Sequence, residues 1–297
     1  MMIDINELRK YGEVIENSSF KKITTLRIGG AIDYLVKPNS IEELKALMSY
    51  IKTNKIPYLV IGNGSNVLAS DNKFEGIVIN LGKLKDIKIA QNEIYAEAGV
   101  SAIRLAQLAM ENNLSGLEFI SGIPGSIGGL IFMNAGAYKK EIKDILIDVL
   151  VLKDSELVLM NKDELGFSYR HSIFKEHRDW IIVAARFSLD VSNKEDIKDL
   201  MDKRRAKRIA TQPQNMPSCG SCFKNPENDF SWRLIDETGN RGYRLNDILV
   251  SDKHCNFILN AKNGTAKDFL LVVDKVKKDV KDKFNIELNL EVEVLEW

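Results

Sequence analysis

The sequence predicts an α+β protein with more than one domain. The chain has 297 residues, whereas one domain typically has roughly 100–200 residues. Segments with helical spacing of apolar residues alternate with apolar runs typical of strands. A change in texture after Val191, from sheet-rich sequence to a charged helix, indicates a domain boundary near that point.

Four segments are predicted as helices. Residues 40–55 begin with a capping box between Ser40 and Glu43. Residues 101–114 begin with Ser101 as the expected N-cap. The charged helix ends at Pro213, and the last helix, 265–285, repeats its apolar residues on one face.

Strands are predicted wherever apolar and β-branched residues form runs bounded by turn residues. Residues 144–160 and 179–191 are expected to be long strands of one sheet, and the chain is expected to finish with a strand over 286–297. Further strands are predicted at 56–61, 76–82 and 92–100.

Composition limits the classes of partner. Lysine plus arginine and aspartate plus glutamate number 42 each, so no overall charge favours binding to nucleic acid or to an anionic membrane. The start of the sequence lacks the apolar core of a signal peptide, and no run approaches the roughly 18 apolar residues of a membrane-spanning helix. Three cysteines are typical of a reducing compartment. We therefore expect a cytoplasmic protein.

Two glycine-rich loops are the strongest candidates for a binding site. Residues 62–66 read "GNGSN" and residues 121–129 read "SGIPGSIGG". The first loop lacks the third glycine of a dinucleotide-binding fingerprint, and the second lacks the lysine of a phosphate-binding P-loop. Both loops could bring backbone N–H groups close to one pyrophosphate. Each loop alone could equally be a tight turn between strands.

The cysteines allow an alternative interpretation. Cys219 and Cys222, together with His254 and Cys255, could form a zinc site. Adjacent residues in a strand point to opposite faces, so His254 and Cys255 would not bind one ion if they lie in a strand. We expect reduced, metal-free thiols and no metal site.

Seven segments occur here in the order in which they occur in the UDP-N-acetylenolpyruvoylglucosamine reductase family. They are "TTLRIGGAIDYLV", "GNGSNVLASD", "AGV", "GLEFISGIPGSIGGLIFMNAGAY", "FSYRHSIF", "GSCFKNP" and "LEVEV". The sequence resembles the shorter type of this family over nearly its whole length. The resemblance implies a p-cresol methylhydroxylase-type FAD-binding fold of two α+β subdomains with a smaller α+β substrate-binding domain. It implies subdomains at 1–82 and 83–200, a substrate domain at 201–284 and a returning strand at 285–297.

The resemblance also implies an activity: NADPH-dependent, FAD-dependent reduction of UDP-N-acetylglucosamine enolpyruvate to UDP-N-acetylmuramate for peptidoglycan. The FAD is expected to be non-covalent and the partners to be small molecules, with no protein partner, nucleic acid or membrane implied. Such a reduction needs a hydride at one carbon, stabilisation of the developing charge and a proton at the neighbouring carbon. The resemblance assigns charge stabilisation to Arg170 and Glu291 and proton donation to Ser221, with Lys224 or a water stabilising the resulting alkoxide.

The remaining site residues also follow from the resemblance. Tyr169, Lys224 and Asn225 are expected at the substrate. The residues expected at FAD are Arg27, Gly62, Asn63, Gly64, Ser65, Asn66, Ser121, Gly122, Gly125, Ser126, Gly128, Gly129, Asn134, Ala135 and Gly136.

Several alternatives stay open at this point. Taken singly, Arg170 could be a surface arginine, Glu291 a solvated residue and Ser221 a turn residue. The basic run from Lys203 to Arg208 could meet a phosphate or simply complement a helix dipole. Other functions would be a sugar or lactone oxidase of the same fold, many of which tether FAD through a histidine, or a non-catalytic nucleotide-binding or zinc-stabilised module.

The sequence departs from the family pattern at three places. Lys139 and Lys140 stand where the family commonly has two glycines, and Leu290 stands where it commonly has proline. Residues 245–260 replace a usual glycine-rich turn. The first departure affects a turn beyond the flavin loop, and the second affects the orientation of Glu291.

Overall fold

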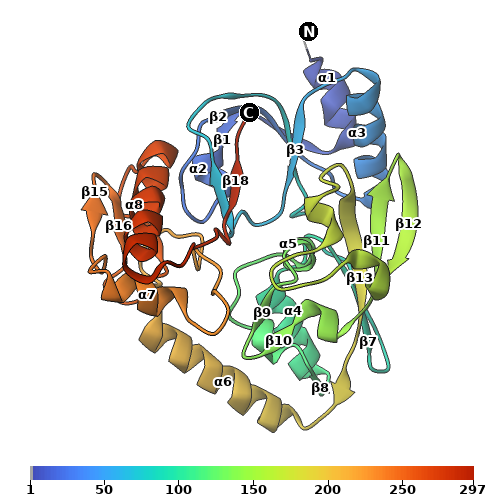
Figure 1. Cartoon of the computed structure of the whole chain (residues 1–297). Helices are drawn as coiled ribbons and strands as arrows, with labels where there is room; N and C mark the ends of the chain where they lie inside the picture. The colour runs from blue at the N-terminus through green and yellow to red at the C-terminus, as the bar shows by residue number, and fades with distance from the viewer. Residues whose placement is uncertain (1–2) are drawn as a thin grey trace. The chain divides into compact units, whose positions relative to one another are not determined.

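A computed structural model describes residues 3–297 and divides them into two compact units. Unit 1 comprises the described residues up to Glu16, then Tyr34–Asn63 and Gly76–Ala206. Unit 2 comprises Asn17–Asp33, Gly64–Glu75 and Lys207–Trp297. The chain therefore passes between the units several times, and each unit is assembled from segments far apart in sequence (Figure 1).

A five-stranded antiparallel sheet is the largest sheet of unit 1. Its strands lie in the order β12-β11-β13-β7-β6, and each neighbouring pair is antiparallel. The apolar residues that predict these strands are buried in one large core together with α4 and α5. The bounds are β6 Ile87–Ala90, β7 Glu93–Glu97, β11 Leu146–Lys153, β12 Glu156–Asn161, β13 Ile181–Ser188, α4 Ala102–Glu111 and α5 Ile127–Phe132.

A second sheet has the order β1-β2-β5-β3. Within unit 1, β3 and β5 are parallel, and Tyr58 pairs with Ile77 in their register. Parallel strands need a long crossover connection, and residues 62–73 form the connection between the end of β3 and the start of β5. The bounds are α1 Ile5–Leu8, β1 Glu13–Ser19, α2 Phe20–Ile23, β2 Ala31–Lys37, α3 Ile41–Thr53, β3 Tyr58–Ile61 and β5 Phe74–Asn80.

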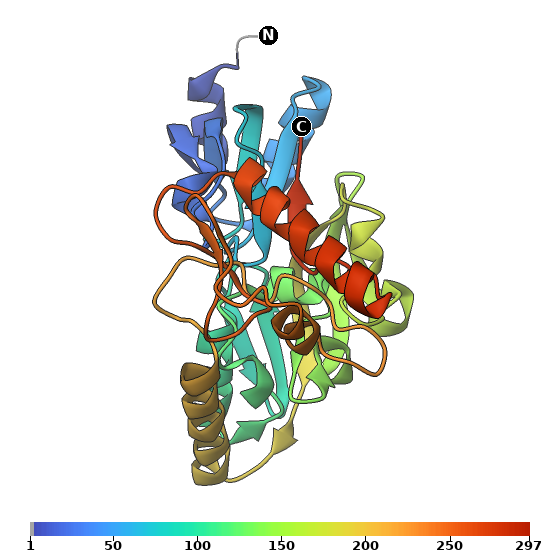
Figure 2. The ribbon, with the colours of Figure 1, turned by 60° about the vertical axis from the view of Figure 1, so that its left-hand side comes forward.

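Unit 2 has its own core. The long helix α8, red-orange in Figures 1 and 2, buries Phe269, Val272, Val273, Val276 and Val280 against the small sheet β15-β16-β17. The C-terminal strand β18 pairs in parallel with β4. The bounds are β4 Val67–Ala69, α7 Ser231–Glu237, β15 Arg244–Leu245, β16 Ile248–Val250, β17 Ile258–Asn260, α8 Ala266–Phe284 and β18 Glu293–Leu295.

One long helix and several short elements complete the described chain. The helix α6 spans Lys194–Thr211 and buries only Ile197. Two small ladders pair β8 with β14 and β9 with β10. The bounds are β8 Leu114–Ser115, β9 Gly136–Ala137, β10 Lys140–Glu141, β14 Asp190–Val191, and the 3₁₀ turns η1 Arg9–Tyr11, η2 Glu118–Ile120, η3 Ile142–Asp144, η4 Lys162–Leu165 and η5 Ile173–Lys175.

The predicted helices are confirmed as α3, α4, α6 and α8. Ser40 accepts a hydrogen bond from the backbone N–H of Glu43 at 3.1 Å. The return half of the capping box differs, because the Glu43 carboxylate accepts from the backbone N–H of Asn39 at 2.7 Å instead. Ser101 occupies the N-cap of α4 without a side-chain cap hydrogen bond.

Two predicted strands and one assumed strand need correction. Residues 144–160 form a hairpin rather than one strand, because Asp154 and Ser155 both adopt positive φ angles, 48° and 68°, and reverse the chain between β11 and β12. The final strand is limited to Glu293–Leu295. His254 and Cys255 lie in a turn and not in a strand, so the strand argument used for them was wrong.

Candidate active site

The two glycine-rich segments meet within unit 1. A Cβ on Gly62 would lie 2.2 Å from Ser126 Oγ, so glycine allows the two segments to approach closely without moving this hydroxyl. Asn63 Nδ2 donates a hydrogen bond to the carbonyl of Pro124 at 3.3 Å. The predicted proximity of residues 62–63 to the loop 121–129 is therefore present in this unit.

The loop 121–129 is anchored from behind. The backbone N–H of Ile127 bonds to Val100, and the N–H of Gly128 bonds to Ala98, both at 2.9 Å. Within residues 3–297, the backbone N–H groups of Gly122, Gly125 and Ser126 donate no hydrogen bond. Backbone N–H groups without a protein acceptor, on a loop that is held rigidly, fit the phosphate oxygens of a dinucleotide such as FAD.

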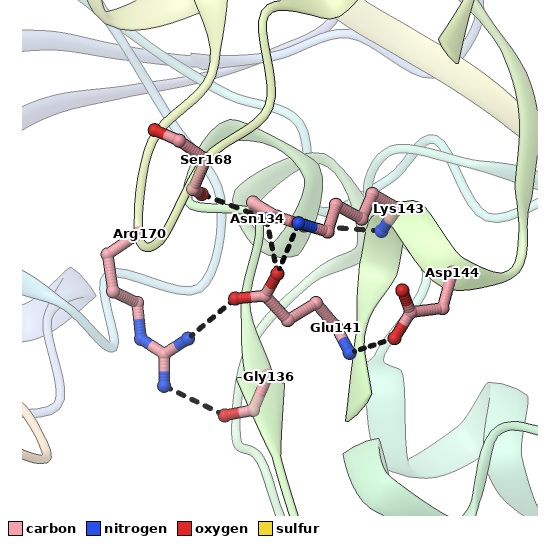
Figure 3. Close-up of polar contacts among 7 residues, drawn as sticks. All are labelled: Asn134, Gly136, Glu141, Lys143, Asp144, Ser168 and Arg170. Atoms are coloured by element: carbon pink, nitrogen blue, oxygen red, sulfur yellow. Dashed lines mark hydrogen bonds and ion pairs between the residues drawn. The ribbon is translucent and has the colours of Figure 1, made fainter. Parts of the chain in front are cut away.

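Asn134 lies at the centre of a polar network beyond this loop (Figure 3). The residue is fully buried. Its Nδ2 donates to Glu141 Oε2 at 3.1 Å and to the carbonyl of Ser168 at 2.9 Å, and its Oδ1 accepts from the backbone N–H of Lys143 at 3.2 Å. The side chain of Asn134 thus organises the protein around it, while its contact to the cofactor stays a prediction.

Arg170 projects from a tight turn. The backbones of Ser168 and His171 bond to each other at 3.2 and 3.1 Å, and Arg170 adopts a positive φ of 55°. Its Nη2 donates to the carbonyl of Gly136 at 2.9 Å, and its Nη1 lies 3.9 Å from Glu141 Oε1. Its guanidinium also lies 4.9 Å from the centre of the exposed Tyr169 ring. A positive φ is uncommon at a non-glycine residue, and here it results from the tight turn between Ser168 and His171.

In unit 2, residues 64–66 lie against the C-terminal segment. Asn66 Nδ2 donates to the carbonyl of Glu291 at 3.0 Å, and the N–H of Glu293 donates to the carbonyl of Asn66 at 2.9 Å. Arg27, also predicted at FAD, is exposed and has a positive φ of 56°. Its carbonyl accepts a hydrogen bond from Asn260 at 3.3 Å.

The segment that contains Ser221 is held on two sides. The N–H of Cys222 bonds to the carbonyl of Asn256 at 2.7 Å, and the N–H of Glu291 bonds to the carbonyl of Cys222 at 2.8 Å. Asn256 also exchanges side-chain hydrogen bonds with the backbone of Phe223, at 2.9 and 2.8 Å. Unit 2 therefore brings Ser221 and Glu291 onto neighbouring segments, whereas Arg170 belongs to unit 1.

Lys224 and Asn225 continue from the Ser221 segment into α7. Ser231 donates from Oγ to the carbonyl of Lys224 at 2.6 Å. The Oδ1 of Asn225 accepts from the backbone N–H of Ser231 at 3.1 Å. The Lys224 carbonyl and the Asn225 side chain are thus held by Ser231 at the start of α7.

All three cysteines are buried as free thiols. Burial raises the pKa of the Cys219 thiol to about 12, and the nearby carboxylate of Glu291 adds to this increase. Burial also raises the pKa of Cys222 well above its usual value, with Cys219 and Glu291 adding to it. Among residues 3–297, no group of three or more histidine, cysteine or acidic side chains is arranged to hold a metal ion.

Two residues of this region did not emerge from the sequence. Glu141 contacts Arg170 and Asn134, and Asn256 holds the Ser221 segment. No local pattern identifies either residue, because both act across the fold. Their positions beside predicted site residues are visible only in the structure.

Comparisons with known proteins agree with this geometry. Residues 32–159 match the family described as FAD binding domain, and residues 212–295 match the C-terminal domain of UDP-N-acetylenolpyruvoylglucosamine reductase. The reductase of Carboxydothermus hydrogenoformans is 44% identical, covering 95% of this chain and 94% of its own length. The reductase of Caldanaerobacter subterraneus subsp. tengcongensis is 39% identical, covering 98% and 96% respectively.

A solved structure agrees as well. The UDP-N-acetylenolpyruvylglucosamine reductase of Thermus caldophilus superposes with a TM-score of 0.81 at 35% identity, covering 96% of this chain and 98% of that one. These matches confirm the α+β FAD-binding fold and FAD as the cofactor. No helix among the described residues is long and apolar enough to cross a membrane. The chain belongs to the UDP-N-acetylenolpyruvoylglucosamine reductase family.

Proposed function

We propose that this chain reduces UDP-N-acetylglucosamine enolpyruvate to UDP-N-acetylmuramate, with FAD bound non-covalently and NADPH as the reductant. The product is a precursor of peptidoglycan. The proposal includes a cytoplasmic location and small molecules, the UDP-sugar and NADPH, as partners. It also keeps the division into subdomains 1–82 and 83–200, a substrate domain 201–284 and a returning strand 285–297. The FAD-binding match at 32–159 lies across both subdomains, and the C-terminal match at 212–295 lies within the substrate domain and the returning strand.

The observation that carries the proposal is the pairing of Phe223 with Leu290 in unit 2. This antiparallel bridge aligns the Ser221 segment with the segment of Glu291, although the two are far apart in sequence. A proton donor and a carboxyl group on adjacent, hydrogen-bonded segments suit a substrate whose own carboxylate must be polarised next to the carbon that receives a proton.

Bound FAD supplies the hydride chemistry. Ser221 donates a proton to the substrate carbon next to the one that receives the hydride. Lys224 or a bound water stabilises the serine alkoxide that remains. A serine hydroxyl is a weak acid, so this step depends on such stabilisation. Arg170 supplies a permanent positive charge to the substrate carboxylate as negative charge develops, and Glu291 helps to polarise that carboxylate.

Stopped-flow flavin spectroscopy tests the function. We expect NADPH to bleach the flavin and the enolpyruvyl substrate to reoxidise it without oxygen. Flavin that stays reduced in the presence of this substrate would show that the assigned reaction is wrong. Acid precipitation should release the flavin into solution, whereas a yellow precipitate would favour an oxidase with covalently attached FAD.

Ser221→Ala tests the proton donor. The variant should retain flavin reduction by NADPH and lose most of its reoxidation by substrate, by a factor of about 100 or more for a general acid. Equal loss of both half-reactions would count against proton donation by Ser221. Ser218→Ala is the matched control, because Ser218 lies three residues away on the same segment and is engaged through its carbonyl, which accepts from Thr25 at 2.6 Å.

A further inference from the structure

Glu141 makes two kinds of contact. As the N-cap of η3 it forms a capping box with Asp144, in which its backbone N–H bonds to Asp144 Oδ2 at 2.8 Å and its side chain accepts from the backbone of Asp144. The same carboxylate faces Asn134, Lys143 and Arg170, as Figure 3 shows. Capping alone explains the first set of contacts and leaves the second set unexplained.

The second set of contacts ends at Arg170. Gly136 and Glu141 are opposite each other in the β9–β10 ladder. Arg170 contacts both of them, through the carbonyl of Gly136 and the carboxylate of Glu141. Asn134 joins the same carboxylate to the carbonyl of Ser168, which begins the turn that carries Arg170. Glu141 therefore contacts the guanidinium of Arg170 directly, and it contacts the turn that carries Arg170 through Asn134.

Glu141 shares its carboxylate between two basic side chains. Lys143 Nζ lies 3.0 Å from Glu141 Oε2, closer than the 3.9 Å between Arg170 Nη1 and Glu141 Oε1. The Glu141 carboxylate thus lies within ion-pair range of both cations, and Lys143 is the nearer one. The side chains of Arg170 and Glu141 are only 16% and 20% exposed, so solvent screens their interaction less than that of a surface pair.

We propose that Glu141 is a positioning residue that fixes the guanidinium of Arg170 for the substrate carboxylate. The inference rests on the proposed function, in which Arg170 stabilises the developing charge. Loss of the carboxylate removes orientation, which slows the reaction, and also removes a competing negative charge near the bound anion. The maximal rate should therefore fall while the substrate concentration for half-maximal rate changes little.

The experiment uses the full-length protein loaded with FAD. After reduction by NADPH, anaerobic reoxidation by the enolpyruvyl substrate is followed over a range of substrate concentrations. We expect Glu141→Gln to lower the saturating reoxidation rate about tenfold. Its half-saturating concentration and its rate of flavin reduction should stay within about twofold of wild type. The control Asp144→Asn weakens the other half of the capping box and should leave both half-reactions within about twofold.

Two further variants complete the test. Glu141→Asp keeps a capping carboxylate but shortens it, so it should fold well and still slow reoxidation. Glu141→Gln should cause no additional loss in an Arg170→Met background, because coupled residues are not additive. Reoxidation at the wild-type rate in both Glu141 variants, or full additivity with Arg170→Met, overturns the inference. A wild-type flavin that the substrate fails to reoxidise instead overturns the proposed function.

Discussion

Asn66 donates a hydrogen bond from its Nδ2 to the backbone carbonyl of Glu291 at 3.0 Å. The bond joins a residue of the first glycine-rich loop to the backbone of the residue that carries the proposed catalytic carboxyl group, 225 residues further along the chain. The parallel pairing of β4 with β18 begins at the next residue on the loop side, where Val67 is opposite Glu293. The position of Glu291 thus depends on the loop as well as on its own strand.

Asn66→Ala should weaken this connection. Losing one partly buried hydrogen bond costs about 1 kcal/mol of unfolding free energy, and we expect that decrease in urea unfolding together with slower reoxidation of the flavin by substrate. Asn54→Ala is the control, since Asn54 Nδ2 donates to the carbonyl of Tyr50 at 2.8 Å and Asn54 is not among the predicted site residues. If Asn66→Ala released FAD but left reoxidation of the remaining holoenzyme unchanged, Asn66 would act on the cofactor alone.

Leu290 should tolerate the proline that is common in the family. The hydrogen bonds of the bridge between Phe223 and Leu290 are made by the residues on either side of them. The N–H of Lys224 bonds to the carbonyl of Asn289, and the N–H of Glu291 bonds to the carbonyl of Cys222, both at 2.8 Å. The N–H of Leu290 takes no part in these bonds, so proline removes none of them. Leu290→Pro should keep the unfolding free energy within about 1 kcal/mol of wild type or raise it.

Glu293→Pro is the matched control for this substitution. It removes the N–H that bonds to the carbonyl of Asn66 at 2.9 Å, and it should lower the unfolding free energy by more than about 1 kcal/mol. Equal destabilisation by both prolines would show that the backbone at Leu290 cannot adopt the φ angle of proline.

Local patterns predicted the helices of this fold well. Apolar spacing identified α8 and its buried face, and Ser40 marked the start of α3, because these signals act within a few residues. The hairpin between β11 and β12 was missed although its polar turn residues, Asp154 and Ser155, interrupt the apolar run, because the apolar residues on both sides were assigned to one strand. The roles of Glu141 and Asn256 depend on segments that meet only in the folded chain, so no local pattern could reveal them.

The two-residue turn at Tyr138 and Lys139 gives a reason for the first of the two glycines that the family commonly has at positions 139 and 140. Both residues have positive φ angles, 56° and 63°, between the short strands β9 and β10. Hairpin turns of this type favour glycine, because other residues pay a steric cost in the left-handed region. Lys139→Gly should therefore raise the unfolding free energy by about 0.5–1 kcal/mol, the left-handed cost less the entropy that glycine gains when unfolded.

Lys140→Gly distinguishes this conformational effect from the loss of a lysine charge. Lys140 lies in β10 without a positive φ, so glycine should lower the unfolding free energy there by roughly 0.5–1 kcal/mol. Thermal or urea unfolding of the two variants measures the difference. Similar shifts in both variants would contradict the conformational explanation.

The buried thiols predict a fall in stability at alkaline pH. The usual pKa of a cysteine is 9.0, and that of Cys219 is raised to about 12 by burial and by the carboxylate of Glu291. Between these values the unfolded thiol loses its proton while the folded thiol keeps it, so the unfolded state binds fewer protons. The unfolding free energy should therefore fall as pH rises from about 9 towards 12, and this contribution should be fully present below pH 9.

Urea unfolding at pH 8, 9, 10 and 10.5 measures this slope. Cys219→Ala removes one of the thiols whose pKa is raised and should make the decline shallower, while Ser218→Ala, a neighbouring change without a titrating group, should leave it unchanged. The same thiols should resist alkylation in the folded protein, because Cys219, Cys222 and Cys255 are at most 2% exposed and the thiolate is the reactive form. A slope that is identical in wild type and Cys219→Ala would show that Cys219 keeps an ordinary pKa in the folded state.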